Sequence, residues 1–231
     1  MNEEDSVLRH CACCKMPPTI LLAQSTFCTK CFLDRLERGF FSEIRKALSH
    51  TFRSKMRKVL VVIDETLSSQ AVQSLTRRST AAMIAYDYCT FSQDKPDCIH
   101  LVSKDSSHSS RVEAAKEYGL EHGYDCVIFS HYSVEVAYEI LKMITVGEIV
   151  QYTTAFKGTK TMTVCYPFYA LSYKSILYFC FHTGLLHAPF GIKADSSKEN
   201  KAHRVLLRDL LKNSPASILN LIKIQRRVEE M

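Results

Sequence analysis

Short runs of apolar residues alternate along most of this chain with stretches in which apolar positions recur every three or four residues. The runs are unbroken and lie between polar turns, which is typical of strands buried on both faces. The spaced stretches are typical of amphipathic helices. Strands that alternate with helices predict an α/β fold, a parallel sheet with helices on both faces. The predicted strands are residues 58–63, 98–102, 126–129 and 161–165, and the predicted helices are residues 68–75, 80–89, 109–122, 133–144, 172–182, 199–211 and 216–229.

Four cysteines near the start of the chain have the spacing of a metal site. Cys11 and Cys14 form one Cys-x-x-Cys pair, and Cys28 and Cys31 form a second pair thirteen residues later. Two such pairs can complete a tetrahedron of thiolates around one zinc ion, with no open position for chemistry. The spacing therefore predicts a structural zinc site, with Cys13 as a spare or idle thiol. Buried free cysteines are the alternative interpretation.

The segment around these cysteines differs from the rest of the chain and predicts separate elements. Residues 1–31 show little periodicity, whereas residues 32–56 carry apolar residues at helical spacing, with Gly39 as a weak point. We therefore expect three parts. They are a four-cysteine zinc ribbon at residues 1–33, a basic linker helix at residues 34–57, and the α/β domain at residues 58–231.

Positive charge is concentrated in the first quarter of the chain. The net charge is +6, and residues 1–58 hold eleven Lys or Arg against six Asp or Glu. Beside a zinc module, such a run favours contact with nucleic-acid phosphates, while a merely solvated helix face is the alternative. The candidate contact residues are Arg45, Lys46, Arg53, Lys55, Arg57 and Lys58.

The turn after the first strand of the α/β domain is where such a sheet would bind a nucleotide. This turn has no glycine, so its backbone cannot approach a pyrophosphate closely. Asp64 and Glu65 would repel phosphates, and Thr66 follows them. Ser68 and Ser69 are expected to cap the next helix. The sequence predicts a degenerate nucleotide loop.

The order of these features resembles the cytoplasmic tRNA 2-thiolation protein 2 family. Its members are adenine nucleotide α-hydrolase-like (PP-loop) proteins and are partner subunits of a thiolase that modifies wobble uridine. The segment 27–32 resembles the family's second cysteine pair, and residues 64–69 lie where active relatives have Ser-Gly-Gly-x-Asp-Ser, with Ser69 alone retained. Residues 130–137 resemble Gly-His-Asn-x-Asp-Asp-x-Ala, and residues 144–147 and 166–176 resemble two later segments.

The resemblance implies a non-catalytic subunit of a cytoplasmic wobble-uridine (U34) thiolation complex. Such a subunit would bind the catalytic thiolase subunit as a heterodimer or larger assembly and help to hold tRNA. Active relatives carry a further central Cys-x-x-Cys, which this chain lacks. Two alternatives remain open: an independent zinc-ribbon protein that binds nucleic acid or regulates, and an active ATP-dependent tRNA sulfurtransferase.

The histidines and the apolar runs add two further expectations. His100 is expected in the core, His131 follows a strand without an acidic partner, and His182 and His187 are expected to cap a helix end. No apolar run reaches the length of a membrane span, and the acidic start has no signal-peptide pattern. The sequence therefore predicts a soluble cytoplasmic protein without a membrane partner.

Overall fold

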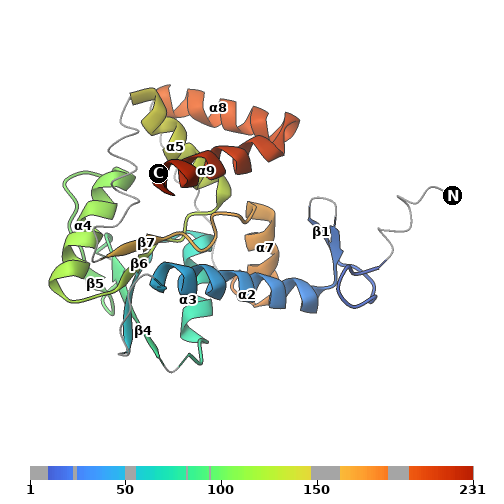
Figure 1. Ribbon diagram of the computed structural model, residues 1–231, viewed down its shortest axis with the longest axis horizontal. Coiled ribbons are helices and arrows are strands. Elements are labelled where there is room, and N and C mark those ends of the chain that lie inside the picture. Colours follow the sequence, from blue (N-terminus) through green and yellow to red (C-terminus); the bar gives the residue numbers. More distant parts are fainter. Residues whose placement is uncertain are drawn as a thin grey trace.

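Five parallel strands form the central sheet of the protein. The computed structural model describes residues 10–22, 25–49, 56–81, 83–93, 95–146, 162–186 and 198–230. The strands run in the order β5-β4-β3-β6-β7, with β3 in the middle (Figure 1). This is the predicted α/β class. The strands are β3 (Arg57–Val62), β4 (Ile84–Thr90), β5 (Ile99–His100), β6 (Cys126–Ile128) and β7 (Thr163–Cys165).

Helices cover both faces of this sheet, as the continuous apolar strands predicted. Alternate residues of β3 point to opposite faces, so Val59 and Val61 join one hydrophobic core while Leu60 and Val62 join the other. The first face is covered by α2 (Thr29–Leu48), α3 (Leu67–Arg77) and α7 (Tyr173–His182). The second face is covered by α4 (His108–Glu121), α5 (Ser133–Val146), α8 (Lys198–Asn213) and α9 (Pro215–Glu230).

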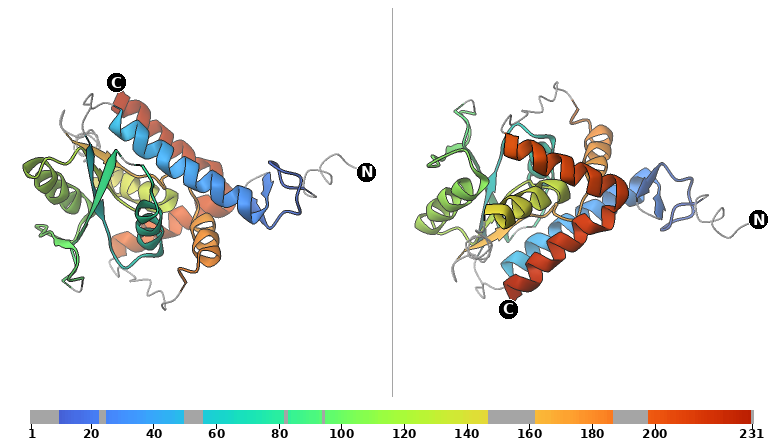
Figure 2. Two further views of the ribbon diagram at one scale, coloured as in Figure 1. Left: turned by 90° about the horizontal axis from the view of Figure 1, so that it is seen from below. Right: turned by 90° about the horizontal axis from the view of Figure 1, so that it is seen from above.

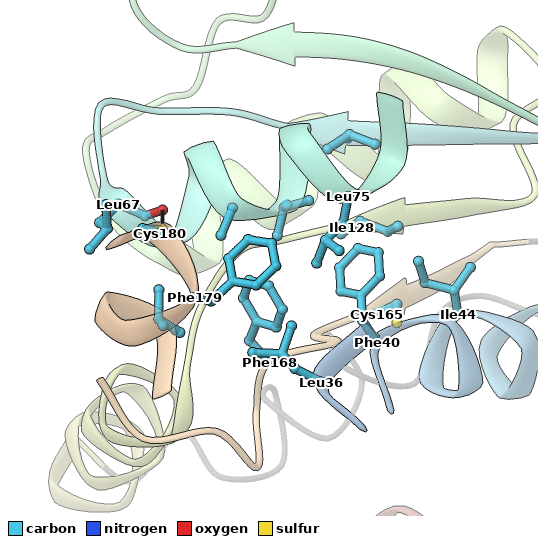
Figure 3. Packing of buried hydrophobic residues seen from close by; sticks show 14 of the residues in the cluster. Leu36, Phe40, Ile44, Leu67, Leu75, Ile128, Cys165, Phe168, Phe179 and Cys180 are labelled. Atoms are coloured by element: carbon cyan, nitrogen blue, oxygen red, sulfur yellow. Dashed lines mark hydrogen bonds between the residues drawn. The ribbon is translucent and has the colours of Figure 1, made fainter. Parts of the chain in front are cut away.

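Aromatic side chains fill the core between α2, α3 and α7. Phe40 of α2 packs on Phe168 with ring centroids 5.3 Å apart, and Phe179 of α7 lies in the same cluster (Figure 3). All three side chains are almost completely buried. Burying an aromatic side chain contributes about 2–3 kcal/mol through the hydrophobic effect, so this cluster fixes α2 and α7 against the sheet.

The cysteine-rich segment forms a small hairpin at the end of α2 that lies away from the sheet (Figures 1 and 2). Its strands β1 (Ile20–Leu22) and β2 (Ser25–Phe27) pair antiparallel, with Ile20 opposite Phe27. Tyr178 of α7 holds the hairpin in place. Its hydroxyl hydrogen-bonds with Thr19 and Thr29. Its ring centroid lies 5.0 Å from that of Phe32, with the two rings nearly perpendicular.

The linker helix was predicted with the wrong ends. Helix α2 begins at Thr29, directly after Cys28, and ends at Leu48, where Ser49 forms a turn. Gly39 lies inside α2 on its exposed side and does not break it. Residues 50–55 lie outside the described residues, and Arg57 already belongs to β3. The six candidate phosphate contacts therefore do not share one helix.

The helix predicted at residues 80–89 is wrong, because residues 84–90 form strand β4. This strand pairs in parallel with the whole length of β3, from Arg57 opposite Ile84 to Val62 opposite Cys89. The small residues before it favoured a helix locally, but pairing with the central strand decides the structure. The other predicted strands and helices are confirmed, with ends that differ by a few residues. In the described part of the chain, no helix is long and apolar enough to cross a membrane.

Candidate functional site

The four predicted metal ligands lie together at one end of the protein. The Sγ atoms of Cys11, Cys14, Cys28 and Cys31 all lie within 4.8 Å of one another, and those of Cys14 and Cys28 are 3.5 Å apart. Zinc–sulfur bonds of about 2.3 Å in a tetrahedron place sulfurs about 3.8 Å apart. The four thiols therefore fit one metal ion after a small contraction.

The backbone around these cysteines has the tight turn that a metal-binding pair requires. The Cys11 N–H donates to the carbonyl oxygen of Met16 at 2.9 Å, and Lys15 takes a left-handed backbone with φ of 62°. The N–H of Cys13 donates to the sulfur of Cys11 at 3.4 Å. On the other side, Cys28 precedes the first residue of α2 and Cys31 lies in its first turn. A helix N-terminus stabilises negative charge, which suits thiolate ligands.

The four thiols influence one another's acidity. Hydrogen bonds from the backbone, that of Cys28 first, lower the pKa of the Cys11 thiol to about 6. The pKa of Cys31 is raised, first through its side-chain contact with Cys14 and then through that with Cys28. One thiolate thus opposes ionisation of the others, and a bound cation would remove this repulsion. Zinc specifically remains the prediction from the sequence.

A second group of polar residues lies at the carboxyl edge of the sheet. The chain moves from β3 to β4 on one side and later returns to β6 on the other, so the order of strands reverses between β3 and β6. Ligands of open α/β sheets bind at this switch point. Asp64 follows β3 here and His131 follows β6. The degenerate loop predicted from the sequence therefore lies where a nucleotide would bind.

The loop after β3 uses its own side chains to satisfy its backbone. The Asp64 carboxylate accepts from the N–H of Thr66 at 2.8 Å and also from its hydroxyl. The N–H of Asp64 donates to the hydroxyl of Ser69 at 2.9 Å. Thr66 caps α3 by accepting from the N–H of Ser69 at 3.2 Å. Three amides that could have faced a phosphate are thus already bonded, and a carboxylate lies among them.

The cap predicted at Ser68 and Ser69 is therefore corrected. Both side chains are buried, and Thr66 is the residue that precedes α3 and accepts its amide. Thr66 is the N-cap because its backbone is extended, with φ of −76° and ψ of 156°, which is the usual conformation of an N-cap residue. Lys95 reaches this loop from the other side and donates to the carbonyl oxygen of Asp64 at 2.7 Å.

Two histidines and a tyrosine form an aromatic group beside this loop, in which His108 and Tyr166 are buried and His131 is half-buried. The rings of His108 and His131 lie 4.2 Å apart, and Nε2 of His108 is 2.8 Å from the hydroxyl of Tyr166. Burial lowers the pKa of His131 to about 4, although the charge of Asp64 acts in the opposite direction. Burial also lowers the pKa of His108. Both imidazoles are therefore neutral near pH 7. The expectation that His131 lacks an acidic neighbour is wrong.

Two carboxyl groups on α5 complete this group. Glu135 accepts from the N–H of Tyr132 at 3.1 Å, which closes the first turn of the helix. Burial raises the pKa of Glu135 to about 8, and the charges of Asp64 and Glu139 add to the effect. Burial raises the pKa of Glu139 as well, one turn further along α5. Arg111 of α4 has a buried Nε without a partner among the described residues, as does Nδ1 of His131.

Sequence reasoning found only part of this group. His131 is named in the sequence analysis and Glu135 lies in the resembling segment 130–137, whereas no motif in the sequence pointed to His108, Arg111 or Glu139. Each strand of a parallel sheet ends at the same edge, so residues just after strands or at the start of the next helix converge there. His108 is the first residue of α4 and carries that signal.

The predicted phosphate contacts have different surroundings. Arg45 and Lys46 are exposed in the last turn of α2, and Lys46 pairs with Glu43 at 2.6 Å. Arg57 lies 3.4 Å from Asp125, while the side chain of Lys58 is exposed. Contact of these residues with tRNA stays a prediction. Arg53 and Lys55 lie outside the described residues.

The remaining cysteines and histidines are distributed through the structure. Cys89, Cys126, Cys165 and Cys180 are buried and Cys98 is half-buried, in agreement with a packing role. His100 is exposed rather than in the core, and its Nδ1 lies 3.1 Å from the carbonyl oxygen of Ser92. It lies on the short edge strand β5, where one face stays open. His182 is the last residue of α7, and His187 lies outside the described residues.

Comparison with known proteins shows similarity of structure rather than of sequence. No sequence family matches the chain, and no characterised protein sequence matches it. The fold is similar to that of the U34-tRNA thiolase NcsA from Methanococcus maripaludis, solved with its [4Fe-4S] cluster. That likeness has a TM-score of 0.74 and 13% identity and covers 96% of this chain and 87% of the thiolase. The NH3-dependent NAD synthetase from Campylobacter jejuni, solved with nitrate, matches with a TM-score of 0.41 and 14% identity over 86% of this chain and 93% of its own.

Proposed function

We propose that this protein takes part in 2-thiolation of the wobble uridine of tRNA, as a non-catalytic subunit in the cytoplasm. The observation that carries the proposal is the fold, which it shares with a U34-tRNA thiolase over 96% of its length. That shared length is nearly the whole chain. The resemblance of the sequence motifs to the partner subunits of such thiolases supports the same function.

The loop after β3 supports a role without catalysis. A nucleotide loop needs free amides and close backbone approach to hold phosphates. Here the amides of Asp64, Thr66 and Ser69 bond to side chains of the same loop. The carboxylate of Asp64 adds a negative charge at the place of the phosphates, and Coulomb repulsion opposes binding there. We infer that the catalytic step belongs to another subunit.

Zinc is the ion that we propose for the cysteine cluster. Cys11, Cys14, Cys28 and Cys31 would hold it, and a site filled by four thiolates leaves no position for a reacting molecule. Its contribution would be to fold the hairpin, which is too small to have a hydrophobic core of its own. The [4Fe-4S] cluster of the similar thiolase makes iron the competing ion, and metal analysis of purified protein separates the two.

Two partners follow from this proposal. A catalytic thiolase subunit would supply the nucleotide site and the sulfur chemistry, and tRNA would be the shared substrate. The basic residues Arg45, Lys46, Arg53, Lys55, Arg57 and Lys58 are the contacts proposed from the sequence. Among those described, Arg45 and Lys58 have exposed side chains without an ion pair to a described residue, so they are the better candidates.

The decisive experiment measures thiolated uridine in tRNA. Cells that lack this protein should lose wobble 2-thiouridine, measured by mass spectrometry of digested tRNA, and the wild-type protein should restore it. His131→Asn and Glu135→Gln should restore it as well, because the proposed catalytic groups lie in the other subunit. A thiolase-like protein should copurify from the same cells. Normal thiolation in cells without the protein would refute the function. A folded His131→Asn or Glu135→Gln variant that fails to restore 2-thiouridine would favour the hypothesis that this protein is itself an active sulfurtransferase.

A further inference from the structure

Helix α8 packs one side against the rest of the protein. Leu207 is buried, and His203 and Leu210 are half-buried on the same side of the helix. His203 lies 3.2 Å from the hydroxyl of Thr145 on α5 and meets the ring of Tyr138. Residues of α8 also contact α9, which packs on α5 (Figure 1). This face therefore anchors α8 to the layer of helices over the sheet.

The opposite side of α8 carries a line of exposed positive charges. Arg204, Arg208 and Lys212 are four residues apart, so successive side chains lie on neighbouring turns about 6 Å apart along the axis. We call these three residues the α8 ridge. Figures 1 and 2 show α8 at the outside of the molecule, beside α9 and against α5.

Among the described side chains of α8, little negative charge is available to neutralise the α8 ridge. Asp209 is the one carboxylate among the described side chains of α8, and it lies beside Lys212 rather than beside Arg204. None of the three ridge residues forms an ion pair with a described residue. Lys223 of α9 is also exposed and adds to the positive charge of this helical layer. The ridge thus offers two guanidinium groups and one ammonium group to an anionic partner.

We propose that the α8 ridge binds the sugar–phosphate backbone of tRNA. This inference rests on the proposed function, and it adds a contact surface that the basic run at residues 45–58 does not include. A regular line of cationic side chains matches a regular line of phosphates, and its two arginines can each pair with a phosphate through two parallel hydrogen bonds. Such contacts position the RNA without reading its sequence.

The packing of α8 favours RNA over a lipid surface. A basic helix that lies on a membrane inserts its apolar face into the lipid. In this protein that face is covered by α5 and α9, so it is not free to insert. Val205, Leu206 and Leu211 are partly exposed on α8, but they are scattered around the helix rather than grouped opposite the ridge.

The test compares two variants with the same change of charge. Arg204→Glu/Arg208→Glu reverses the ridge, and Arg38→Glu/Lys104→Glu reverses two exposed residues on α2 and in the loop before α4. Full-length proteins, purified with any copurifying thiolase subunit, are titrated with a tRNA transcript at several salt concentrations. The ridge variant should bind about tenfold more weakly at low salt, and the slope of log affinity against log salt should fall by about two. The control variant should bind nearly as the wild type does.

Each of the other possible results overturns the proposal that the α8 ridge binds tRNA. Equal affinities and slopes for the ridge variant and the wild type would do so, and so would equal losses in both variants, which would indicate net charge alone. Loss of a copurifying protein with unchanged tRNA affinity would assign the ridge to a protein partner instead. A wild-type protein that binds no tRNA also overturns it. The thiolation function is judged separately, by the 2-thiouridine content of cells that lack the protein.

Discussion

Replacing Glu135 by Gln should stabilise the protein, and the gain should grow with pH. Glu135 is held near other carboxylates at the switch point, and burial first raises its pKa from 4.5 to about 8. Because the pKa of this carboxyl group is higher in the folded state, the folded protein holds the proton more tightly than the unfolded protein does. Its stabilising contribution is full below the unfolded pKa and falls as pH rises toward the folded pKa.

The size of this effect follows from the two pKa values. Between pH 5 and pH 8, Glu135 ionises in the unfolded protein but stays largely protonated in the folded protein. At 1.36 kcal/mol per pH unit, this lowers the free energy of unfolding by up to about 3 kcal/mol. Glutamine keeps an oxygen that can accept from the N–H of Tyr132, so the start of α5 is preserved. Glu135→Gln therefore removes the pH-dependent cost and little else.

Urea unfolding at pH 5, 6.5 and 8, followed by circular dichroism with saturating metal, measures the difference. The free energy of unfolding of Glu135→Gln minus that of the wild type should rise by about 3 kcal/mol from pH 5 to pH 8. Glu121→Gln is the matched control, because Glu121 is exposed at the last residue of α4, and its difference should stay constant. A constant difference for Glu135→Gln would refute the burial argument.

Three shorter predictions concern the two sites and their connection. Purified protein should hold one zinc ion per chain by metal analysis, and protein that holds iron or no metal would contradict this. The Cys14→Ser/Cys31→Ser variant should lose the zinc ion, and its hairpin should become sensitive to protease. ATP should bind no tighter than about millimolar by calorimetry, because the loop amides are bonded internally, and micromolar binding would restore the enzyme hypothesis. Tyr178→Phe should weaken docking of the hairpin by about 1 kcal/mol, seen as faster hydrogen exchange in β1 and β2, whereas exposed Tyr173→Phe should not.

Much of the fold could be predicted because its strands carry a strong local signal. Strand β3 is apolar on both faces, as expected for a strand in a sheet that helices cover on both sides. Amphipathic helices alternate with the strands along the chain. The cysteine cluster could also be predicted, since two short pairs need no information from the rest of the fold. These features depend on residues that are close in the sequence.

The features that were missed depend on residues that are distant in the sequence. Strand β4 is half-exposed over most of its length, so its pattern was weak, and pairing with β3 determined it. Arg57 is predicted as a phosphate contact, and the sequence does not show that Asp125, 68 residues further along the chain, lies beside it. The group of His108, His131 and Tyr166 forms only because three separate chain segments reach one edge of the sheet.

Helix α2 explains why the hairpin and the sheet behave as one structure. The boundary predicted between residues 33 and 34 falls inside this helix, which starts at the second cysteine pair and runs for 20 residues, about 30 Å. Cys31 lies in its first turn, Phe32 packs on Tyr178, and Phe40 packs on Phe168 near the sheet. A hinge between metal site and sheet would require a break in this helix, and Gly39 does not provide one. The cysteine cluster therefore stands at a fixed distance from the switch point.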